Sequence, residues 1–281
     1  MPDATVTNWF GDIVSHPVVV VEATSVDDIV AVLKDPGLYP SPVRAVGSYH
    51  STSPCGSADG GTIIKMAKMS KILEITEDTV TAEAGAIYID IAKALEEKNL
   101  QFHVNTEIGS LSAGSAACAG TKDGSMPGEF GQVGSYVIGI KMVLASGDLL
   151  EITEDQTDLM RTVRSCYGTF GIVYQVTFRV RPIVPLAVRH EDYSLQDFIA
   201  KLPALKASGE SLMFYIFPFD DRIIVQFRHY NPGAKGDPNR SLWPLRNYLW
   251  ATAGPAVCAQ AGRDISDLTI RYQVIDAFNE L

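Results

Sequence analysis

Two stretches dense in glycine, serine and alanine constrain this chain more than any other feature. The first covers residues 47–56 and directly follows the short apolar run Val43–Val46, and the second covers residues 108–121. Small side chains let another surface approach the backbone closely, while hydroxyls and backbone N–H groups can hold an anion such as a pyrophosphate. Composition alone leaves two alternatives open: an ordinary turn for the first stretch and tight helix packing for the second.

The residues before the first stretch predict a strand, a helix and a second strand. Val18–Val21 is a β-branched run without polar alternation, which is typical of a strand covered on both faces. Ser25 can cap a helix, and apolar side chains then recur at helical spacing as far as Lys34, where Asp35-Pro36-Gly37 ends the pattern. Val43–Val46 is the second predicted strand.

Strands dominate the pattern that follows. Thr62–Met66 and Val80–Gly85 predict strands, and Ile87–Asn99 predicts a helix with one apolar face. From Tyr136 onward the chain is mainly strand-like. Ile172–Val180 alternates apolar and polar residues well enough for an antiparallel strand with one solvated face.

A change of character beyond Pro185 predicts a second domain, so we expect domains over residues 1–185 and 186–281. The second domain should contain a helix near 195–205 and a hairpin of 212–217 with 223–230, turning at Asp220-Asp221. Residues 265–281 have a helix-like pattern without a glycine or proline stop. We therefore expect this domain to be only partial: a truncated product, a processed fragment, or a subunit completed by another chain.

Composition excludes several classes of protein. The formal net charge is −10 and no basic run is present, which argues against nucleic acid and anionic lipid as partners. No membrane span or signal peptide is recognisable, so we expect a cytoplasmic protein. The four cysteines and five histidines form no metal-ligand spacing, and the chain lacks the P-loop, the GxGxxG, the GxSxG and the HExxH motifs. We predict no metal site.

The order of the remaining motifs resembles the FAD-binding domain of the vanillyl-alcohol oxidase and p-cresol methylhydroxylase type. The resemblance spans roughly Trp9 to Pro182. It begins with Asn8-Trp9 and continues with Arg44–Ser51, the second small-residue stretch, and residues 166–173. In many members the histidine at the position of His50 bonds covalently to the flavin. The His50-Ser51 pair followed by Cys55, together with Ile64–Met69, is nearest to the aldonolactone and alditol oxidase branch, which includes gulonolactone oxidase.

This resemblance implies an α+β fold. It consists of a two-subdomain FAD-binding domain, with a small mixed α/β subdomain and an antiparallel-sheet subdomain, followed by a partial α+β cap that binds substrate. The implied cofactor is FAD, with His50 as the residue of a covalent link. No catalytic residue is assigned. The implied cofactor-binding residues are Arg44, Val46, Gly47, Ser48, Tyr49, His50, Ser51, Cys55, Ile108, Gly109, Ser110, Gly114, Ser115, Cys118, Gly120, Thr121, Gly168, Gly171, Ile172 and Val173.

The activity implied by the resemblance is FAD-dependent oxidation of a CH–OH group in a sugar lactone, polyol or related alcohol. Hydride would pass to flavin N5, and O₂ or another acceptor would receive the electrons. Two alternatives stay open: a flavin-binding but catalytically incomplete chain, such as a subunit, fragment or pseudoenzyme, and a noncatalytic interaction domain. The expected partners are the small-molecule substrate and either a second chain that completes the cap or a further copy of this chain.

Overall fold

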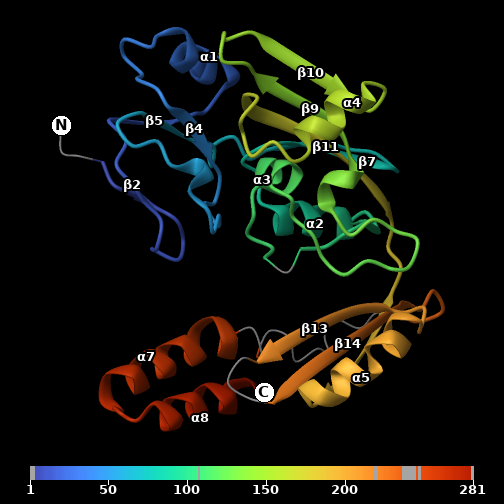
Figure 1. Cartoon of the computed structure of the whole chain (residues 1–281). Helices are drawn as coiled ribbons and strands as arrows, with labels where there is room; N and C mark the ends of the chain where they lie inside the picture. Colours follow the sequence, from blue (N-terminus) through green and yellow to red (C-terminus); the bar gives the residue numbers. More distant parts are fainter. Residues whose placement is uncertain (1–3, 107, 218–220, 236–244, 246–247, 280–281) are drawn as a thin grey trace. The chain divides into compact units, whose positions relative to one another are not determined.

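The computed structural model describes the chain except for residues 1–3, 107, 218–220, 236–244, 246–247 and 280–281 (Figure 1). The chain divides into two compact units, Met1–Ile183 and Val184–Leu281. Both units mix helices with strands, as the sequence predicts. The assignment of the second unit as a substrate cap stays a prediction.

A small parallel sheet opens the first unit. Its strand order is β3 (Val19–Glu22), β5 (Thr62–Lys65) and β4 (Val43–Val46), with β5 in the middle. Helix α1 (Val26–Lys34) connects β3 to β4 and begins with a capping box, in which the Ser25 hydroxyl accepts from the Asp28 N–H and the Asp28 carboxylate accepts from the Ser25 N–H. A β-hairpin precedes this sheet, and its two strands, β1 (Val6–Thr7) and β2 (Val14–Ser15), have two residues each.

A larger antiparallel sheet forms the rest of the first unit (Figure 1). Its central strand is β11, whose eleven residues pair with three other strands. Its members are β10 (Leu149–Thr153), β9 (Val137–Val143), β11 (Ile172–Pro182), β7 (Thr79–Glu83) and β6 (Ile72–Ile75) in that order, with β8 (Leu100–Phe102) also pairing with β11.

Three helices accompany this sheet: α2 (Tyr88–Glu96), α3 (Ala113–Cys118) and α4 (Thr157–Val163). The main hydrophobic core includes buried side chains from all three helices and from the sheet. Tyr88 of α2 stacks on Phe102 of β8, with ring centroids 4.1 Å apart, and its hydroxyl donates to the Val104 carbonyl at 2.8 Å. The second small-residue stretch belongs to the same core through Ala113, Ala116 and Ala117. Short 3₁₀ turns, η1 (Pro54–Gly56) and η2 (Val133–Tyr136), complete the unit.

The second unit contains a three-stranded antiparallel sheet in the order β12 (Leu186–Tyr193), β14 (Arg222–Tyr230), β13 (Ser211–Phe217). Alternate residues of β14 are buried and pack with helix α5 (Leu195–Lys206) in one core. The predicted hairpin and helix are therefore present, although Asp220 of the predicted turn lies outside the described residues. A π-helical turn η4 (Leu249–Ala253) leads into α7 (Gly254–Asp264), and α8 (Leu268–Asn279) follows.

Two local differences from the sequence expectation concern the site. The helix expected over 87–99 ends at Glu96, and Asn99 adopts φ +58° before the chain enters strand β8. The second small-residue stretch is not irregular throughout, because residues 113–118 form α3. Within the described residues, no helix combines the length and the apolar character that crossing a membrane requires.

Candidate functional site

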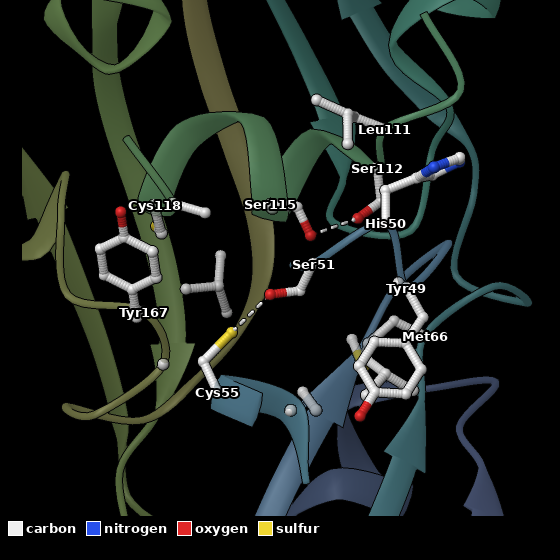
Figure 2. Close-up of a pocket in the computed structure, with 18 of the residues that line it drawn as sticks. Tyr49, His50, Ser51, Cys55, Met66, Leu111, Ser112, Ser115, Cys118 and Tyr167 are labelled. Atoms are coloured by element: carbon white, nitrogen blue, oxygen red, sulfur yellow. Dashed lines mark hydrogen bonds between the residues drawn. The ribbon is translucent and has the colours of Figure 1, made fainter. Parts of the chain in front are cut away.

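Three segments far apart in the sequence line one cavity of about 540 Å³ in the first unit (Figure 2). They are residues 44–56, residues 108–121 and residues 167–173, with Met66 and Ala84 between them. This volume falls within the usual range for small-molecule and cofactor sites. The cavity therefore joins the two small-residue stretches that the sequence singles out.

The first segment leaves the parallel sheet at Val46 and turns immediately at Gly47. A Cβ atom on Gly47 would lie 2.0 Å from the Ser112 hydroxyl oxygen and 2.7 Å from the Ser112 Cβ, so only glycine lets the two segments meet here. Tyr49 then adopts φ +55°, and its carbonyl accepts from the Trp9 N–H at 3.0 Å. The loop is thus fixed at both ends of its first turn.

Asn8 anchors the same loop from the N-terminal hairpin. Its side chain is buried, and its amide nitrogen donates to the Ser51 carbonyl at 3.0 Å and to Asp12 Oδ1 at 2.7 Å. Its amide oxygen accepts from the N–H groups of Gly11 and Ile13. Because one amide satisfies four partners, Ser51 is held at the cavity with little freedom.

His50 belongs to the first segment and contacts the second. Its Nε2 is hydrogen-bonded to the Ser110 hydroxyl at 2.8 Å, and its ring lies 5.3 Å from the ring of Trp9. Figure 2 shows the imidazole pointing away from Ser51 and Cys55. Nδ1 is buried and makes no hydrogen bond with any of the described residues. Burial lowers the pKa of His50, so the ring is neutral at pH 7 and keeps one unused nitrogen.

The second segment uses its two faces differently. Ala113, Ala116 and Ala117 of α3 are fully buried, and the N–H groups of Ala113 and Gly114 donate to the carbonyls of Ala86 and Ala84 at 2.8 Å. The residues between them, among them Ser115, line the cavity. The alternative of tight helix packing is therefore confirmed for one face of the helix, and binding of a ligand by the other face stays a prediction.

The third segment closes the cavity from the antiparallel sheet. Tyr167 and Gly168 have φ values of +50° and +74°, and the Tyr167 N–H donates to the Cys118 carbonyl at 3.1 Å. A Cβ atom on Gly171 would lie 2.5 Å from the Val143 carbonyl oxygen, which explains a glycine at the start of β11. Ile172 and Val173 follow and also line the cavity.

The polar groups of the cavity suit an anion held mainly by neutral donors. Among the described residues that line it, Arg44 is the one that carries a permanent charge. Hydroxyl groups come from every segment: Tyr49, Ser51, Thr52, Ser53, Ser112, Ser115, Thr121 and Tyr167. Hydroxyls and backbone N–H groups with a single guanidinium form the donor set expected around a pyrophosphate.

Most residues that the sequence assigns to cofactor binding line this cavity, and four do not. Ser48, Gly109, Ser110 and Gly120 lie outside the lining. The Ser110 hydroxyl is instead hydrogen-bonded to the His50 imidazole. Gly120 lies next to Tyr167, because a Cβ atom on Gly120 would lie 2.9 Å from the Tyr167 hydroxyl. The residues that line the cavity without having been assigned are Ala45, Thr52, Ser53, Gly56, Met66, Ala84, Leu111, Ser112, Ala119 and Tyr167.

One of the unassigned residues had a usable signal in the sequence. Met66 directly follows β5, which is parallel to β4, and parallel strands end at the same edge of a sheet. Val46 at the end of β4 was predicted to bind the cofactor, and the same prediction could therefore have been made for Met66. Tyr167 lies in the block 166–173 that carries the family resemblance, but its positive φ cannot be read from residue types.

Comparison with known proteins identifies the domain. Residues 17–153 match the family model described as "FAD binding domain". These residues are similar to an FAD-binding domain. The match covers the first two segments of the cavity and stops before the third. The buried, unpaired Nδ1 of His50, the glycine turn and the hydroxyl-rich lining all fit FAD as the ligand of this cavity.

The chain is also similar to oxidases and dehydrogenases whose names specify sugar lactones. The chain is 25% identical to an L-gulono-1,4-lactone dehydrogenase of Mycobacterium tuberculosis, over 79% of this chain and 51% of that protein. It is 23% identical to an L-gulonolactone oxidase of Scyliorhinus torazame, over 78% and 50%. It is 27% identical to a D-arabinono-1,4-lactone oxidase of Candida glabrata, over 78% and 42%. The chain spans about half the length of these curated relatives.

Proposed function

We propose that this chain is the FAD-binding part of an oxidoreductase that oxidises a CH–OH group of a sugar lactone, a polyol or a related alcohol. O₂ or another acceptor takes up the electrons. The observation that carries the proposal is the convergence of three separate segments on one cavity, two of them within the residues that match the FAD-binding domain model. The substrate class is taken from relatives whose names specify gulonolactone and arabinono-1,4-lactone.

In this proposal the first two segments hold the pyrophosphate of FAD. Arg44 supplies the positive charge, while Ser51 and Ser115 supply hydroxyl donors. Gly47 and Gly114 let the walls of the cavity pack closely, since a Cβ atom would lie 2.0 Å from the Ser112 hydroxyl at Gly47 and 3.0 Å from the Ala84 Cβ at Gly114. A neutral donor set also keeps the desolvation cost of the site lower than a cluster of lysines would.

His50 is the proposed residue of a covalent link. Its Nε2 is engaged with the Ser110 hydroxyl, and Nδ1 has no hydrogen-bond partner among the described residues. The direction of the bond to Ser110 sets the tautomer: if the hydroxyl donates to Nε2, the proton of the neutral ring lies on Nδ1, and if it accepts, Nδ1 carries the lone pair. The second arrangement is the one that lets Nδ1 form a bond to carbon.

The apolar part of the lining would separate the reacting groups from water. Ile108 and Leu111 come from the second segment, and Val173 comes from β11. When bound, FAD supplies the two-electron acceptor for the oxidation of the substrate carbon. The protein's contribution is to bind the cofactor in one orientation and to exclude solvent from one side of it.

The visible spectrum of the purified chain, followed by acid precipitation, tests the cofactor part of the proposal. We expect a flavin spectrum, with the yellow colour in the pellet if His50 is linked to the flavin. Colour in the supernatant would keep FAD and remove the link. A colourless chain that also takes up no added FAD would contradict the proposal and favour a noncatalytic domain.

Turnover tests the remaining part. The flavin-loaded chain should reduce an artificial dye or O₂ with L-gulono-1,4-lactone or an alditol, and not with L-lactate, a 2-hydroxy acid of similar polarity. A yellow chain that is inactive with every lactone and alditol would instead support a flavin-binding chain that needs a second polypeptide for catalysis. The same assay repeated after adding candidate partner chains would separate those outcomes.

A further inference from the structure

Trp9 contacts the first segment of the cavity twice, through its backbone and through its ring. It lies in the turn of the N-terminal hairpin, between β1 and β2, directly after Asn8. Its backbone N–H donates to the Tyr49 carbonyl at 3.0 Å. Its indole ring lies 5.3 Å from the imidazole of His50, measured between ring centroids, and the two ring planes are inclined by 44°. Trp9 therefore contacts two consecutive residues of the segment, the second of which is the proposed site of the link to FAD.

Burial in the core does not account for a tryptophan at this position. Trp9 is 60% exposed, whereas an aromatic side chain stabilises a fold mainly through the area that it buries. The hairpin is anchored instead by the buried side chain of Asn8, which bonds to Asp12 and to the Ser51 carbonyl. The indole of Trp9 contacts the imidazole of His50, and this contact is the feature that needs an explanation.

The imidazole of His50 is held by two different parts of the first unit. The Ser110 hydroxyl of the second segment is hydrogen-bonded to Nε2 at 2.8 Å, and the indole of Trp9 packs against the ring. Nδ1 is buried and makes no hydrogen bond with any of the described residues. One hydrogen bond at Nε2 fixes a single corner of the imidazole and leaves the ring able to tilt about that corner. Contact with a second ring restricts this tilt.

We propose that Trp9 is a positioning residue for His50, whose imidazole it holds in the orientation in which Nε2 meets Ser110 and Nδ1 is left for the flavin. This inference rests on the proposed function, because His50 is the residue proposed to be linked to FAD. Trp9 acts through His50 and is assigned no contact with the cofactor. The N-terminal hairpin then supports the first segment in two ways, since Asn8 holds the backbone at Ser51 and Trp9 holds the preceding side chain.

The titration of His50 in the flavin-free chain tests the contact directly. Nitrogen-15 NMR follows both ring nitrogens, and the signals of His50 are those missing from His50→Gln. Burial lowers the pKa of His50 in the wild type. Trp9→Ala opens one side of the imidazole to water, so we expect this pKa to rise and the two neutral tautomers to become mixed. Trp9→Phe keeps an aromatic ring beside His50 and should restore most of the wild-type behaviour.

Phe10→Ala is the matched control for Trp9→Ala. Phe10 is the neighbouring aromatic residue of the same turn, is 69% exposed, and has its ring 5.6 Å from that of Trp9. We expect this variant to leave the titration of His50 unchanged. Because both residues are largely exposed, neither variant should lower the Tm appreciably, and the comparison therefore isolates the contact with the imidazole. An unchanged titration in Trp9→Ala, or an equal change in Phe10→Ala, would overturn the proposal.

Acid precipitation after a fixed incubation of each flavin-free chain with FAD tests the consequence for the cofactor. We expect several-fold less yellow colour in the pellet of Trp9→Ala than in the pellets of the wild type and Phe10→Ala, with Trp9→Phe in between. Equal colour in the pellets of Trp9→Ala and the wild type would overturn the proposal. A wild type that takes up no FAD would contradict the proposed function instead, and the titration of the flavin-free chain would still decide whether Trp9 positions His50.

Discussion

The two small-residue segments of the cavity have similar compositions but different structures. Residues 47–53 form an irregular loop whose hydroxyls bond locally, with the Ser51 hydroxyl donating to the Ser53 carbonyl at 2.9 Å in an exposed setting. Residues 113–118 form a helix, and Ser112 just before it is buried and donates to the Ser115 hydroxyl at 3.0 Å. Alanines favour the helix, whereas serines and Pro54 compete with it through local hydrogen bonds and a missing donor.

This difference separates two ways of building a cofactor site. The first segment owes its shape to groups outside it, namely Asn8 and the N-terminal hairpin. The second owes its shape to its own helix and to buried contacts with the strand that ends at Glu83. Variants in the second segment should therefore cost stability, while variants in the first should mainly affect the bound flavin.

The largest effect should come from the point where the two segments touch. Gly47→Ala places a Cβ 2.0 Å from the Ser112 hydroxyl, so one segment must move. We expect loss of flavin together with a stability loss of about 1–3 kcal/mol, the usual range for overpacking. Flavin retention on gel filtration and denaturant melts measure the two effects. Gly37→Ala is the control, because its Cβ would meet one atom at 3.4 Å, an ordinary contact. Retained flavin in Gly47→Ala would show that the contact is dispensable.

The next effect concerns the hydrogen bond that joins the two segments. If His50 is linked to the flavin, His50→Ala leaves flavin that is bound more weakly and released entirely into the supernatant by acid. Ser110→Ala keeps the imidazole but removes its 2.8 Å partner, so we expect slower or partial linkage at unchanged protein stability. Acid precipitation followed by absorbance of both fractions gives the result. Colour that stays in the pellet of His50→Ala would place the link on another residue.

A smaller effect on stability should distinguish Ser112 from Ser51. Ser112→Ala removes a buried hydroxyl that donates to Ser115, and we expect a loss of about 1 kcal/mol. Ser51→Ala removes a hydroxyl in a solvated loop, and we expect a change within about 0.5 kcal/mol with weaker flavin binding. Urea melts of the apoproteins and FAD titrations compare them. The reverse ranking in stability would contradict the distinction drawn between the segments.

The sequence predicts the positions of the two stretches but not the difference between their structures. Strands β3, β4 and β5 and helix α1 follow from apolar runs and capping residues, and so does the position of the first loop after β4. The helix at 113–118 could not be decided, because alanine and serine in succession suit both a helix and a ligand-binding loop. The contact of the Tyr167 N–H with the Cys118 carbonyl also could not be predicted, since it depends on a long-range approach of two turns.

The contribution of Asn8 was visible only as part of a family motif. Nothing in its residue type shows that one buried amide bonds the Ser51 carbonyl, more than forty positions along the chain. Residue spacing fails for such contacts because it reports local periodicity, whereas a loop anchor depends on which distant segment passes nearby. The second segment is described better by local periodicity. Its buried alanines recur at helical spacing, so its packing follows once the helix is known.

The smallest expected effect is a dependence of stability on pH that originates at the junction of the segments. Burial lowers the pKa of His50, while in the unfolded chain the ring titrates near its ordinary value of about 6.5. As the pH falls below that value, the unfolded chain takes up a proton before the folded chain does, so this contribution to stability is present above about pH 6.5 and is lost on acidification. We therefore expect the Tm of the apoprotein to fall more for the wild type than for His50→Gln between about pH 7.5 and 5.5. Parallel melting curves for the two proteins over that interval would mean that burial does not keep His50 neutral in the folded chain.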